Sequence, residues 1–476
     1  MSYSDIFLSC EKTEDVLSKA RRIHFVGVLG AGMLPLAKLC RSLGYEISGS
    51  DARAYCSAMH AHADCDALFS APITTHAHGL LDGVDLLVVS FAIPKDSPEI
   101  VDAISESIPI FSRAEMLGIL MKRYDRRIGV SGSHGKSTTT ALIDKMLCMG
   151  GVSHITVSGA TLFDGLDARV EPSDTFLYEA CEYRDAFLSF HPTHQVITSI
   201  ELDHTDYFTD IDAIRHSFLS AAERASVGVI LNTDFDGSLE FARMLIAPVI
   251  TYGRAEDADY RYIIDERDRD GYRFRILKGK KSFLNLRTSL IGEYNLANIT
   301  AAVAAADMLG VDAYAIARSV AEFQGIERRM SYLGRIADTD VFYDYAHHPT
   351  EIASAIDAIK ERYSSCAVIF KPHTYSRTKA LWGEFIRALT RSDLAILLDI
   401  YPAREDPIDG ITSENLARDM GNGAFYTDES GAMRYIRDCE YPAVVLMGAG
   451  DISALVDMIK INVNAKKEYF HRKEEH

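Results

Sequence analysis

One glycine-rich run in this chain has the residue types and spacing of a phosphate-binding loop. The run is Gly132-Ser133-His134-Gly135-Lys136-Ser137-Thr138, and it directly follows an apolar stretch at 127–130. A strand that delivers a glycine turn into a helix points backbone N–H groups and a helix N-terminus at one place, which suits nucleotide phosphates. Lys136 would neutralise phosphate charge, and the Ser137 hydroxyl would reach a Mg²⁺ ion. We therefore predict that this loop binds ATP or GTP.

The spacing of the run departs from the general pattern. G-x-x-x-x-G-K-[ST] requires a glycine six residues before the lysine, where this chain has Val130, whereas the shorter G-x-x-G-K-S holds. The alternative without a ligand is a glycine turn that only joins a strand to a helix.

Two acidic clusters follow strand-like runs and offer ligands for a metal ion. The first contains Glu179 and Glu182, and the second contains Glu201, Asp203, His204 and Asp206. A triphosphate site needs such groups for Mg²⁺, and open α/β sheets bind ligands at the carboxyl ends of their strands. For either cluster alone, a solvated loop or a helix cap is the alternative.

A second glycine turn lies near the N-terminus. It has the form Gly27-x-x-Gly30-x-Gly32, and Asp51 ends the next strand-like run. This arrangement is typical of dinucleotide binding, but the glycine spacing is not G-x-G-x-x-G. A turn needed only for packing and a site for another diphosphate are the alternatives.

Composition limits the class of protein. The 476 residues are 47% apolar, which predicts two to four domains. The net charge of −18 argues against non-specific binding of nucleic acid or anionic membranes, and the lack of an apolar run of about 18 residues argues against membrane insertion. Eight cysteines without C-x-x-C spacing, and no signal pattern, favour a reducing cytoplasm. Cys56, His60, His62 and Cys65 suggest zinc, but their spacing fits helix surface better.

The chain reads as three units in which strands and helices alternate, as in parallel α/β sheets. We expect strands at 22–27, 45–51 and 85–92, then at 127–130, 195–200 and 227–231, and finally at 341–344, 367–370, 394–398 and 443–446. The region 252–287 has the alternating pattern of antiparallel hairpins, and an alanine-rich helix follows at 297–309.

Taken together, the motifs resemble the Mur ligase family, ATP-dependent ligases of peptidoglycan precursors, and most closely its branch that adds the first amino acid. The motifs that carry the resemblance are residues 27–33, 50–51, 113–116, 132–138, 179–182, 203–204, 292–298, 325–329, 344–351 and 372–378. The resemblance implies an α/β fold of three domains. These are a Rossmann-like UDP-sugar domain at 1–120, a central P-loop ATPase of mostly parallel sheet with antiparallel hairpins at 121–333, and a Rossmann-like domain at 334–476 that helps to bind the amino acid and ATP.

The resemblance also implies a reaction. ATP would phosphorylate the carboxylate of UDP-N-acetylmuramate, and the amine of L-alanine would attack the acyl phosphate. Lys136 and Mg²⁺, held by Ser137, Glu179 and His204, would offset the repulsion between carboxylate and γ-phosphate. The implied catalytic residues are Lys136, Glu179, His204, His348 and Arg377.

The implied binding residues fall into three groups. ATP would be bound by residues 132–138 with Asn295, Asn298, Arg329 and Asp344. The UDP-sugar would be bound by Gly30, Ala31, Gly32, Met33, Ser50, Asp51, Ser90 and Arg113. The amino acid would be bound by Tyr345, His348 and Arg377.

Five positions depart from the family pattern: Leu29, Ser199, Tyr294, Lys371 and Thr374. They bear on the choice of substrate more than on the chemistry. No lysine lies between Lys145 and Lys278, so that a second Mg²⁺ would rely on Glu201, His204 or Asp206.

Two other functions stay open at this point, a recycling ligase that adds a preformed peptide and a nucleotide-regulated UDP-sugar-binding protein. A monomer and a homodimer are equally compatible with the sequence.

Overall fold

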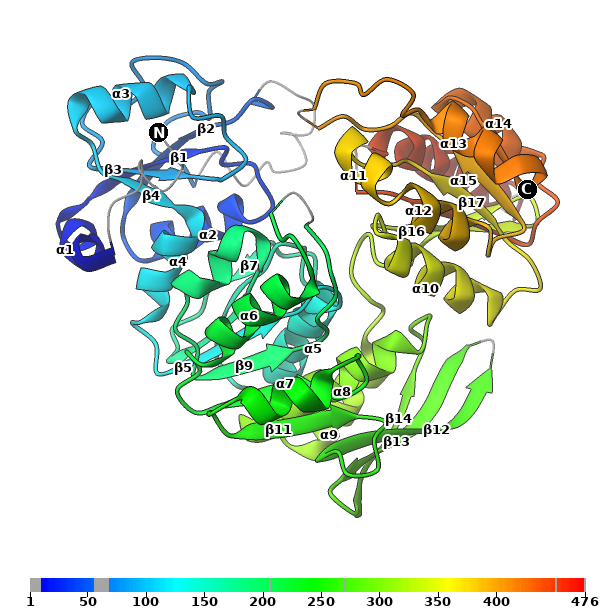
Figure 1. Cartoon of the computed structure of the whole chain (residues 1–476), viewed down its shortest axis with the longest axis horizontal. Helices are drawn as coiled ribbons and strands as arrows, with labels where there is room; N and C mark the ends of the chain where they lie inside the picture. The colour runs from blue at the N-terminus through cyan, green and yellow to red at the C-terminus, as the bar shows by residue number, and fades with distance from the viewer. Residues whose placement is uncertain are drawn as a thin grey trace.

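The computed structural model describes residues 10–54, 68–204, 207–268, 270–403, 405–449 and 452–474. Within them the chain forms three α/β units, each built around one sheet (Figure 1). The expected α/β class, with mostly parallel sheets and some antiparallel strands, is confirmed. The cysteines and histidines considered for zinc, between 56 and 65, and Asp206 lie outside the described residues.

The first unit is a parallel sheet of strand order β2-β1-β3-β4. Its strands are β1 (Arg22–Val26), β2 (Glu46–Ser50), β3 (Leu86–Val89) and β4 (Ile110–Ser112). Its helices are α1 (Cys10–Lys19), α2 (Met33–Ser42), α3 (Pro98–Glu106) and α4 (Arg113–Met121). Strand β3 is entirely apolar because both of its faces are buried, which is why the sequence pattern found it. Strand β4 has only three residues, which are too few to form a recognisable apolar run.

The central unit is a ten-stranded sheet of order β14-β13-β12-β11-β10-β9-β5-β8-β6-β7. Its strands are β5 (Arg126–Ser131), β6 (Ile155–Val157), β7 (Ala168–Arg169), β8 (Thr175–Glu179), β9 (His194–Ile197), β10 (Gly228–Asn232), β11 (Val249–Gly253), β12 (Tyr260–Asp268), β13 (Gly271–Lys278) and β14 (Lys281–Thr288). Its helices are α5 (Lys136–Met149), η3 (Tyr183–Ser189), α6 (Ile211–Ala222), α7 (Ser238–Met244), α8 (Tyr294–Met308) and α9 (Ala313–Glu322). The expected hairpins are β12 to β14, which pair antiparallel.

The third unit is a six-stranded sheet of order β15-β16-β20-β17-β18-β19, parallel except for the pair β15–β16. Its strands are β15 (Ser331–Ile336), β16 (Thr339–Asp344), β17 (Ala367–Phe370), β18 (Leu394–Leu397), β19 (Ala424–Tyr426) and β20 (Ala443–Met447). Its helices are α10 (Pro349–Lys360), α11 (Tyr375–Ala380), α12 (Trp382–Leu389), α13 (Ser413–Met420), η4 (Gly421–Gly423), α14 (Glu429–Arg437) and α15 (Ser453–Glu474).

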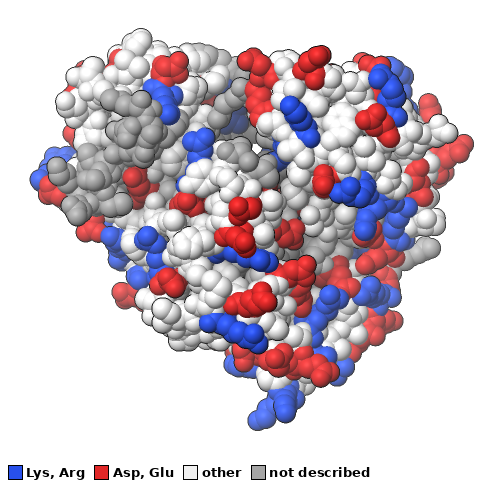
Figure 2. Space-filling model, in the orientation of Figure 1, with Lys and Arg blue, Asp and Glu red and all other residues white. Residues whose placement is uncertain are grey.

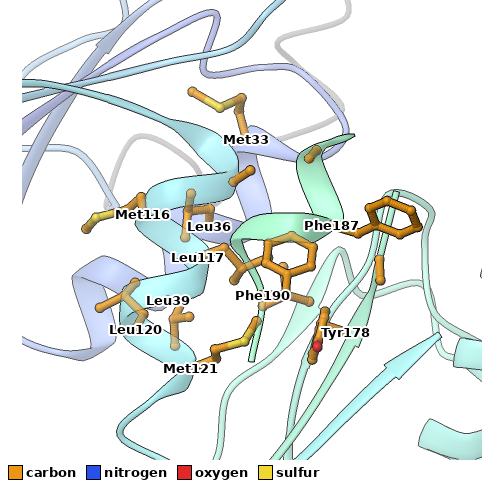
Figure 3. Packing of buried hydrophobic residues seen from close by; sticks show 14 of the residues in the cluster. Met33, Leu36, Leu39, Met116, Leu117, Leu120, Met121, Tyr178, Phe187 and Phe190 are labelled. Carbon is orange, nitrogen blue, oxygen red and sulfur yellow. The ribbon is translucent and has the colours of Figure 1, made fainter. Parts of the chain in front are cut away.

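The first and central units share one hydrophobic core (Figure 3). Leu36 on α2 and Leu117 on α4 pack in the same cluster as Tyr178, Phe187 and Phe190 of the central unit. Burial of apolar surface therefore holds the first two units together. The third unit has two hydrophobic clusters, and one of them includes Ile291 of the central unit. The third unit contacts the central one through Ile291 and through the polar contacts described below.

The surface of the molecule carries both signs of charge. On the face drawn in Figure 2, acidic and basic side chains are interspersed. None of the helices in the described part of the chain has the length and apolar character needed to span a lipid bilayer.

Candidate active site

The predicted phosphate loop joins strand β5 to helix α5, as the sequence pattern requires. Gly132 and Gly135 have φ values of +142° and +85°, which disfavour any residue with a Cβ. A Cβ on Gly132 would lie 2.0 Å from the Thr198 hydroxyl oxygen, and one on Gly135 would lie 2.3 Å from Asn298 Oδ1. Both glycines are therefore required by conformation and by space.

Lys136 begins helix α5 and turns its ammonium group back onto the loop. Nζ donates to the carbonyl oxygens of Gly132 and Ser133, the latter at 3.2 Å, and lies 3.0 Å from Glu182 Oε1. Burial alone would lower the pKa of Lys136, but the Glu182 carboxylate raises it above its usual value. Lys136 is thus a cation held where phosphate charge would arrive.

Glu179 and Ser137 lie together at the end of strand β8. The Ser137 hydroxyl donates to Glu179 Oε1 at 3.0 Å, and Oε2 of the same carboxylate accepts from the Ser158 hydroxyl at 3.0 Å and from the Gly159 N–H at 2.9 Å. A hydroxyl and a carboxylate oxygen beside a phosphate loop are the ligand types that Mg²⁺ prefers. The residues present therefore fit a magnesium ion.

His204 lies beside a different carboxylate. Its Nε2 is 3.7 Å from Glu182 Oε1 and 4.0 Å from Asp203 Oδ2, and no ion pair within 4.0 Å joins it to Glu179 in the described residues. Glu182 is fully buried, and its Oε2 has no hydrogen-bond partner among those residues. The Glu182 position was visible in the sequence as part of an acidic cluster, but its contact with both Lys136 and His204 was not.

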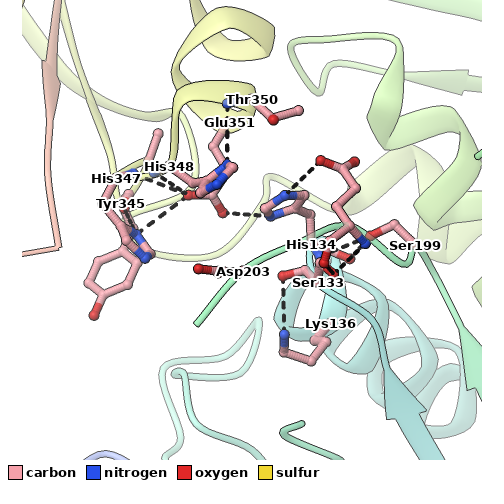
Figure 4. Close-up of polar contacts among 12 residues, drawn as sticks. Ser133, His134, Lys136, Ser199, Asp203, Tyr345, His347, His348, Thr350 and Glu351 are labelled. Atoms are coloured by element: carbon pink, nitrogen blue, oxygen red, sulfur yellow. Dashed lines mark hydrogen bonds and ion pairs between the residues drawn. The ribbon is translucent and has the colours of Figure 1, made fainter. Parts of the chain in front are cut away.

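His134, in the phosphate loop, is held between two carboxylates (Figure 4). Its Nδ1 lies 3.0 Å from Glu351 Oε1, and its Nε2 lies 3.4 Å from Glu201 Oε2. Burial disfavours the charged imidazole, but Glu351 and Glu201 outweigh it and raise the pKa of His134 to about 10. The loop therefore presents an imidazolium cation next to Lys136.

Glu351 reaches this loop from helix α10 of the third unit, 217 residues further along the chain. Its Oε2 also accepts the backbone N–H groups of His347 at 3.1 Å and His348 at 3.3 Å, and its Oε1 lies 3.7 Å from Arg329. In the sequence, Glu351 ends the family motif at 344–351, but the motif implied no role for it. In a single sequence it reads as an N3 glutamate of a helix cap, which it also is.

Asp344 and Tyr345 lie at the junction that leads into α10. Asp344 accepts from the N–H groups of Met330 and Ala346, each at 2.7 Å, and burial raises its pKa to about 6. The Arg329 guanidinium lies 5.5 Å from the centre of the Tyr345 ring. The junction therefore places the charged side chains of Asp344 and Arg329 near the phosphate loop.

Arg377, on α11, crosses between the units in a second ion pair. Its Nη2 lies 3.2 Å from Asp203 Oδ1, and both side chains are largely buried. Burial would raise the pKa of Asp203, but His204 and Arg377 hold it well below its usual value. The predicted amino-acid residue Arg377 thus faces the second acidic cluster of the central unit.

A cavity of about 420 Å³ lies between the phosphate loop, helix α8 and the third unit. Of the predicted nucleotide residues, those lining it are His134, Gly135, Thr138, Asn295, Asn298, Arg329 and Asp344. Asn298 Nδ2 donates to Asn295 Oδ1 at 3.1 Å, and Tyr294 and Ser199, two departures from the family pattern, line the same cavity. Lys136, Glu179, His204, His348 and Arg377 lie outside its lining.

The predicted UDP-sugar residues gather at the start of helix α2. Gly32 caps this helix, and a Cβ on it would lie 3.3 Å from the Arg113 side chain. Asp51 accepts the Leu29 N–H at 2.9 Å, which ties the turn to strand β2. The helix α2 N-terminus, with Ala31 and Met33 on either side of Gly32, and the guanidinium of Arg113 suit a diphosphate.

Two serines of this group are engaged internally. The Ser50 hydroxyl is buried and donates to Glu99 Oε1 at 2.6 Å, in a network with His24 and His76. The Ser90 hydroxyl accepts the Ala92 N–H at 3.2 Å. Both hydroxyls are therefore engaged in hydrogen bonds within the first unit.

Comparison with protein families gives matches along most of the chain. Residues 22–125 match the family described as Mur ligase family, catalytic domain, residues 130–306 match the Mur ligase middle domain, and residues 328–450 match the Mur ligase, glutamate ligase domain.

Relatives and solved structures agree with these matches. UDP-N-acetylmuramate–L-alanine ligase from Thermobifida fusca is 36% identical over 94% of this chain and 97% of its own, and that from Lachnospira eligens is 36% identical over 90% and 96%. The fold is similar to that of UDP-N-acetylmuramate-alanine ligase from Thermotoga maritima, with a TM-score of 0.76 at 24% identity over 94% of this chain and 99% of that one. It is also similar to a murein peptide ligase from Psychrobacter arcticus, with a TM-score of 0.68 at 20% identity over 93% and 98%. The chain belongs to the Mur ligase family.

Proposed function

We propose that this protein joins L-alanine to the carboxylate of UDP-N-acetylmuramate, with ATP as the energy source, in the cytoplasmic synthesis of peptidoglycan precursors. The observation that carries the proposal is that side chains of the third unit reach the central unit at its phosphate loop and at the neighbouring acidic cluster. Glu351 contacts His134 of the loop that holds Lys136, and Arg377 contacts Asp203. The names of the relatives, at 36% identity over nearly the whole chain, support the same substrates.

The proposed chemistry has two steps. A carboxylate oxygen of the sugar nucleotide attacks the γ-phosphorus and ADP leaves; the amine of L-alanine then attacks the acyl carbon, phosphate leaves, and a proton is released. Lys136 and the imidazolium of His134 offset the repulsion between two anions in the first step. Mg²⁺ held by Ser137 and Glu179 would add positive charge at the phosphates.

Each unit receives a role in this proposal. Residues 1–120 bind the UDP-sugar with the α2 turn and Arg113, and residues 121–333 bind ATP. Residues 334–476 contribute Asp344 to ATP, and Tyr345, His348 and Arg377 to the amino acid. The ion pairs Glu351–His134 and Asp203–Arg377 support such a division, because the first joins the third unit to the phosphate loop and the second joins Arg377 to the acidic cluster at 201–204.

The two rival functions are less well supported. A protein that only binds nucleotides does not need a lysine and a histidine that both contact one buried carboxylate, as Lys136 and His204 contact Glu182. A ligase that adds a preformed peptide shares the fold, so that substrates must decide between them.

The test is ADP release by the purified protein with UDP-N-acetylmuramate, Mg²⁺ and either L-alanine, glycine, L-serine or a tripeptide. We expect L-alanine to support the fastest turnover. Turnover with the tripeptide alone would favour the recycling ligase, and no ADP release with any acceptor would contradict the proposal.

A further inference from the structure

Arg184 and Asp185 adopt a backbone conformation that residues with a side chain rarely take. Their φ values are +53° and +58° and their ψ values are +35° and +23°, at the start of η3. The Cβ atom disfavours this left-handed region for nearly all residues except glycine, and an arginine there is strained. Such strain persists only where surrounding contacts enforce it, and it gathers at binding and catalytic sites.

The contacts that enforce this turn are made by Asp185. Its Oδ2 accepts the Tyr207 hydroxyl at 2.6 Å, and its Oδ1 accepts the hydroxyl of Ser217, which is buried on helix α6. Its N–H donates to the Glu182 carbonyl oxygen at 2.9 Å. These contacts hold the chain in the turn, and the side chain of Arg184 takes no part in them.

The side chain of Arg184 is exposed and lies against Tyr183. Its guanidinium carbon is 5.5 Å from the centre of the Tyr183 ring, and its Nε donates to the Tyr183 hydroxyl at 3.2 Å. The Tyr183 ring in turn lies 4.7 Å from the His204 ring, centre to centre. The turn therefore presents a cation at the surface of the molecule, one aromatic ring away from His204.

This turn lies between the two substrate sites of the proposed function. Figure 3 shows helix α4, which begins at Arg113, packed against η3, and a Cβ on Gly118 would lie 2.1 Å from the Ser189 carbonyl oxygen. Burial raises the pKa of the Cys181 thiol to about 11, whereas Lys136 and Arg113 both act to lower it, so that both cations are within electrostatic reach of Cys181. A molecule that extends from Arg113 to Lys136 must pass this segment.

We propose that Arg184 binds the carboxylate of the UDP-sugar and orients it for the reaction. The inference rests on the proposed function, in which the sugar nucleotide extends from the first unit to the phosphate loop with its carboxylate at the far end. A guanidinium holds a carboxylate through two parallel N–H groups, which fixes its direction as well as its charge. Because Lys136 and His134 serve the phosphate, a separate cation on the carboxylate reduces the repulsion between the two anions from the other side.

The experiment is binding calorimetry on the full chain with UDP-N-acetylmuramate and with UDP-N-acetylglucosamine, which lacks the carboxylate. We expect the wild type to bind the first ligand more tightly by about tenfold or more. Arg184→Gln should abolish this preference and change the affinity for UDP-N-acetylglucosamine by less than about twofold. Arg215→Gln on α6 is the matched control, because that guanidinium contacts Asp212 and the Asp236 carbonyl oxygen, and it should keep the preference.

Arg184→Gly separates recognition from folding. Glycine takes a positive φ without strain, and this relief offsets its greater freedom in the unfolded chain, so the Tm should stay at or above that of the wild type. The preference for UDP-N-acetylmuramate should nevertheless be lost, and Arg184→Lys should restore part of it.

Two results would overturn the inference. One is a preference that persists in both Arg184→Gln and Arg184→Gly, or that the wild type lacks. The other is an equal loss of affinity for both UDP-sugars in these variants, which would give the turn a structural role alone. If the wild type binds neither UDP-sugar, the proposed function fails instead.

Discussion

The carboxylate of Glu351 lies 3.0 Å from Nδ1 of His134, which ties the first turn of helix α10 to the phosphate loop. The two residues belong to different units, and both are largely buried. Glu351 also accepts two N–H groups of its own unit, so that one carboxylate joins the start of α10 to the loop.

Replacing Glu351 should change the titration of His134. Because Glu351 and Glu201 raise the pKa of His134 to about 10 against burial, Glu351→Gln removes the first of these two supports, and the pKa should fall towards the neutral range. The measurement is a pH titration of ¹³C-labelled histidine by NMR, with His134→Gln to assign the signal. A His134 signal that stays protonated above pH 9 in Glu351→Gln would contradict this assignment.

The same pair should make thermal stability depend on pH. The folded pKa of His134, about 10, lies above the ordinary 6.5, so its stabilising effect is complete below pH 6.5 and is lost as pH rises through 10. The pKa of Glu351 is lowered, so its own effect is present above 4.5 and is lost in acid. The difference in Tm between wild type and Glu351→Gln should therefore be largest near pH 6 and shrink towards pH 10. A difference that grows with pH would show that the pair does not act in this way.

Lys136→Ala should abolish turnover and also destabilise the fold. Loss of one partner from a buried ion pair costs about 3 kcal/mol, and here it leaves Glu182 as a buried charge beside His204. Adding Glu182→Gln should restore part of the lost Tm but none of the activity. Affinity for the UDP-sugar should persist in Lys136→Ala, since that substrate is assigned to the first unit; an equal loss of both would contradict the domain assignment.

The sequence predicted well those features that depend on neighbouring residues. Buried strands such as β3 and β17 appear as continuous apolar runs, and the phosphate loop appears as a glycine turn between a strand and a helix. It did not predict the short strands β4 and β7, which contain too few residues to form a pattern.

The contacts between site residues of different units could not be predicted from the sequence, for another reason. Glu351 meets His134 and Arg377 meets Asp203 across 217 and 174 residues, and a contact of that kind depends on the packing of separate units. His204 likewise lies beside Glu182, and that contact joins residues 22 positions apart on different segments. A single sequence carries no periodic signal for either.

Gly135→Ala should disrupt the phosphate loop beyond its effect on backbone conformation. A Cβ there meets Asn298 Oδ1 at 2.3 Å, so either the loop or Asn298 must move. We expect a loss of ATP-analogue affinity of about tenfold or more together with a lower Tm. Gly151→Ala is the matched control, because Gly151 also has a positive φ, +67°, but a Cβ there meets nothing within 4 Å. It should lower stability by about 1 kcal/mol and leave nucleotide affinity unchanged; similar losses in both variants would mean that backbone strain alone explains the result.

Arg377→Lys should separate the amino-acid site from the nucleotide site. Lysine keeps the positive charge but loses the planar fork that can bind a substrate carboxylate while it contacts Asp203. The KM for L-alanine should therefore rise by about tenfold, while the KM for ATP changes by less than about twofold. Arg387→Lys on α12 is the control, because that guanidinium is exposed and pairs with Glu384 on the surface, and its kinetics should match the wild type. If the KM values for ATP and L-alanine rise together, Arg377 acts by holding the third unit against the central one, and Asp203→Asn should then reproduce the same double effect.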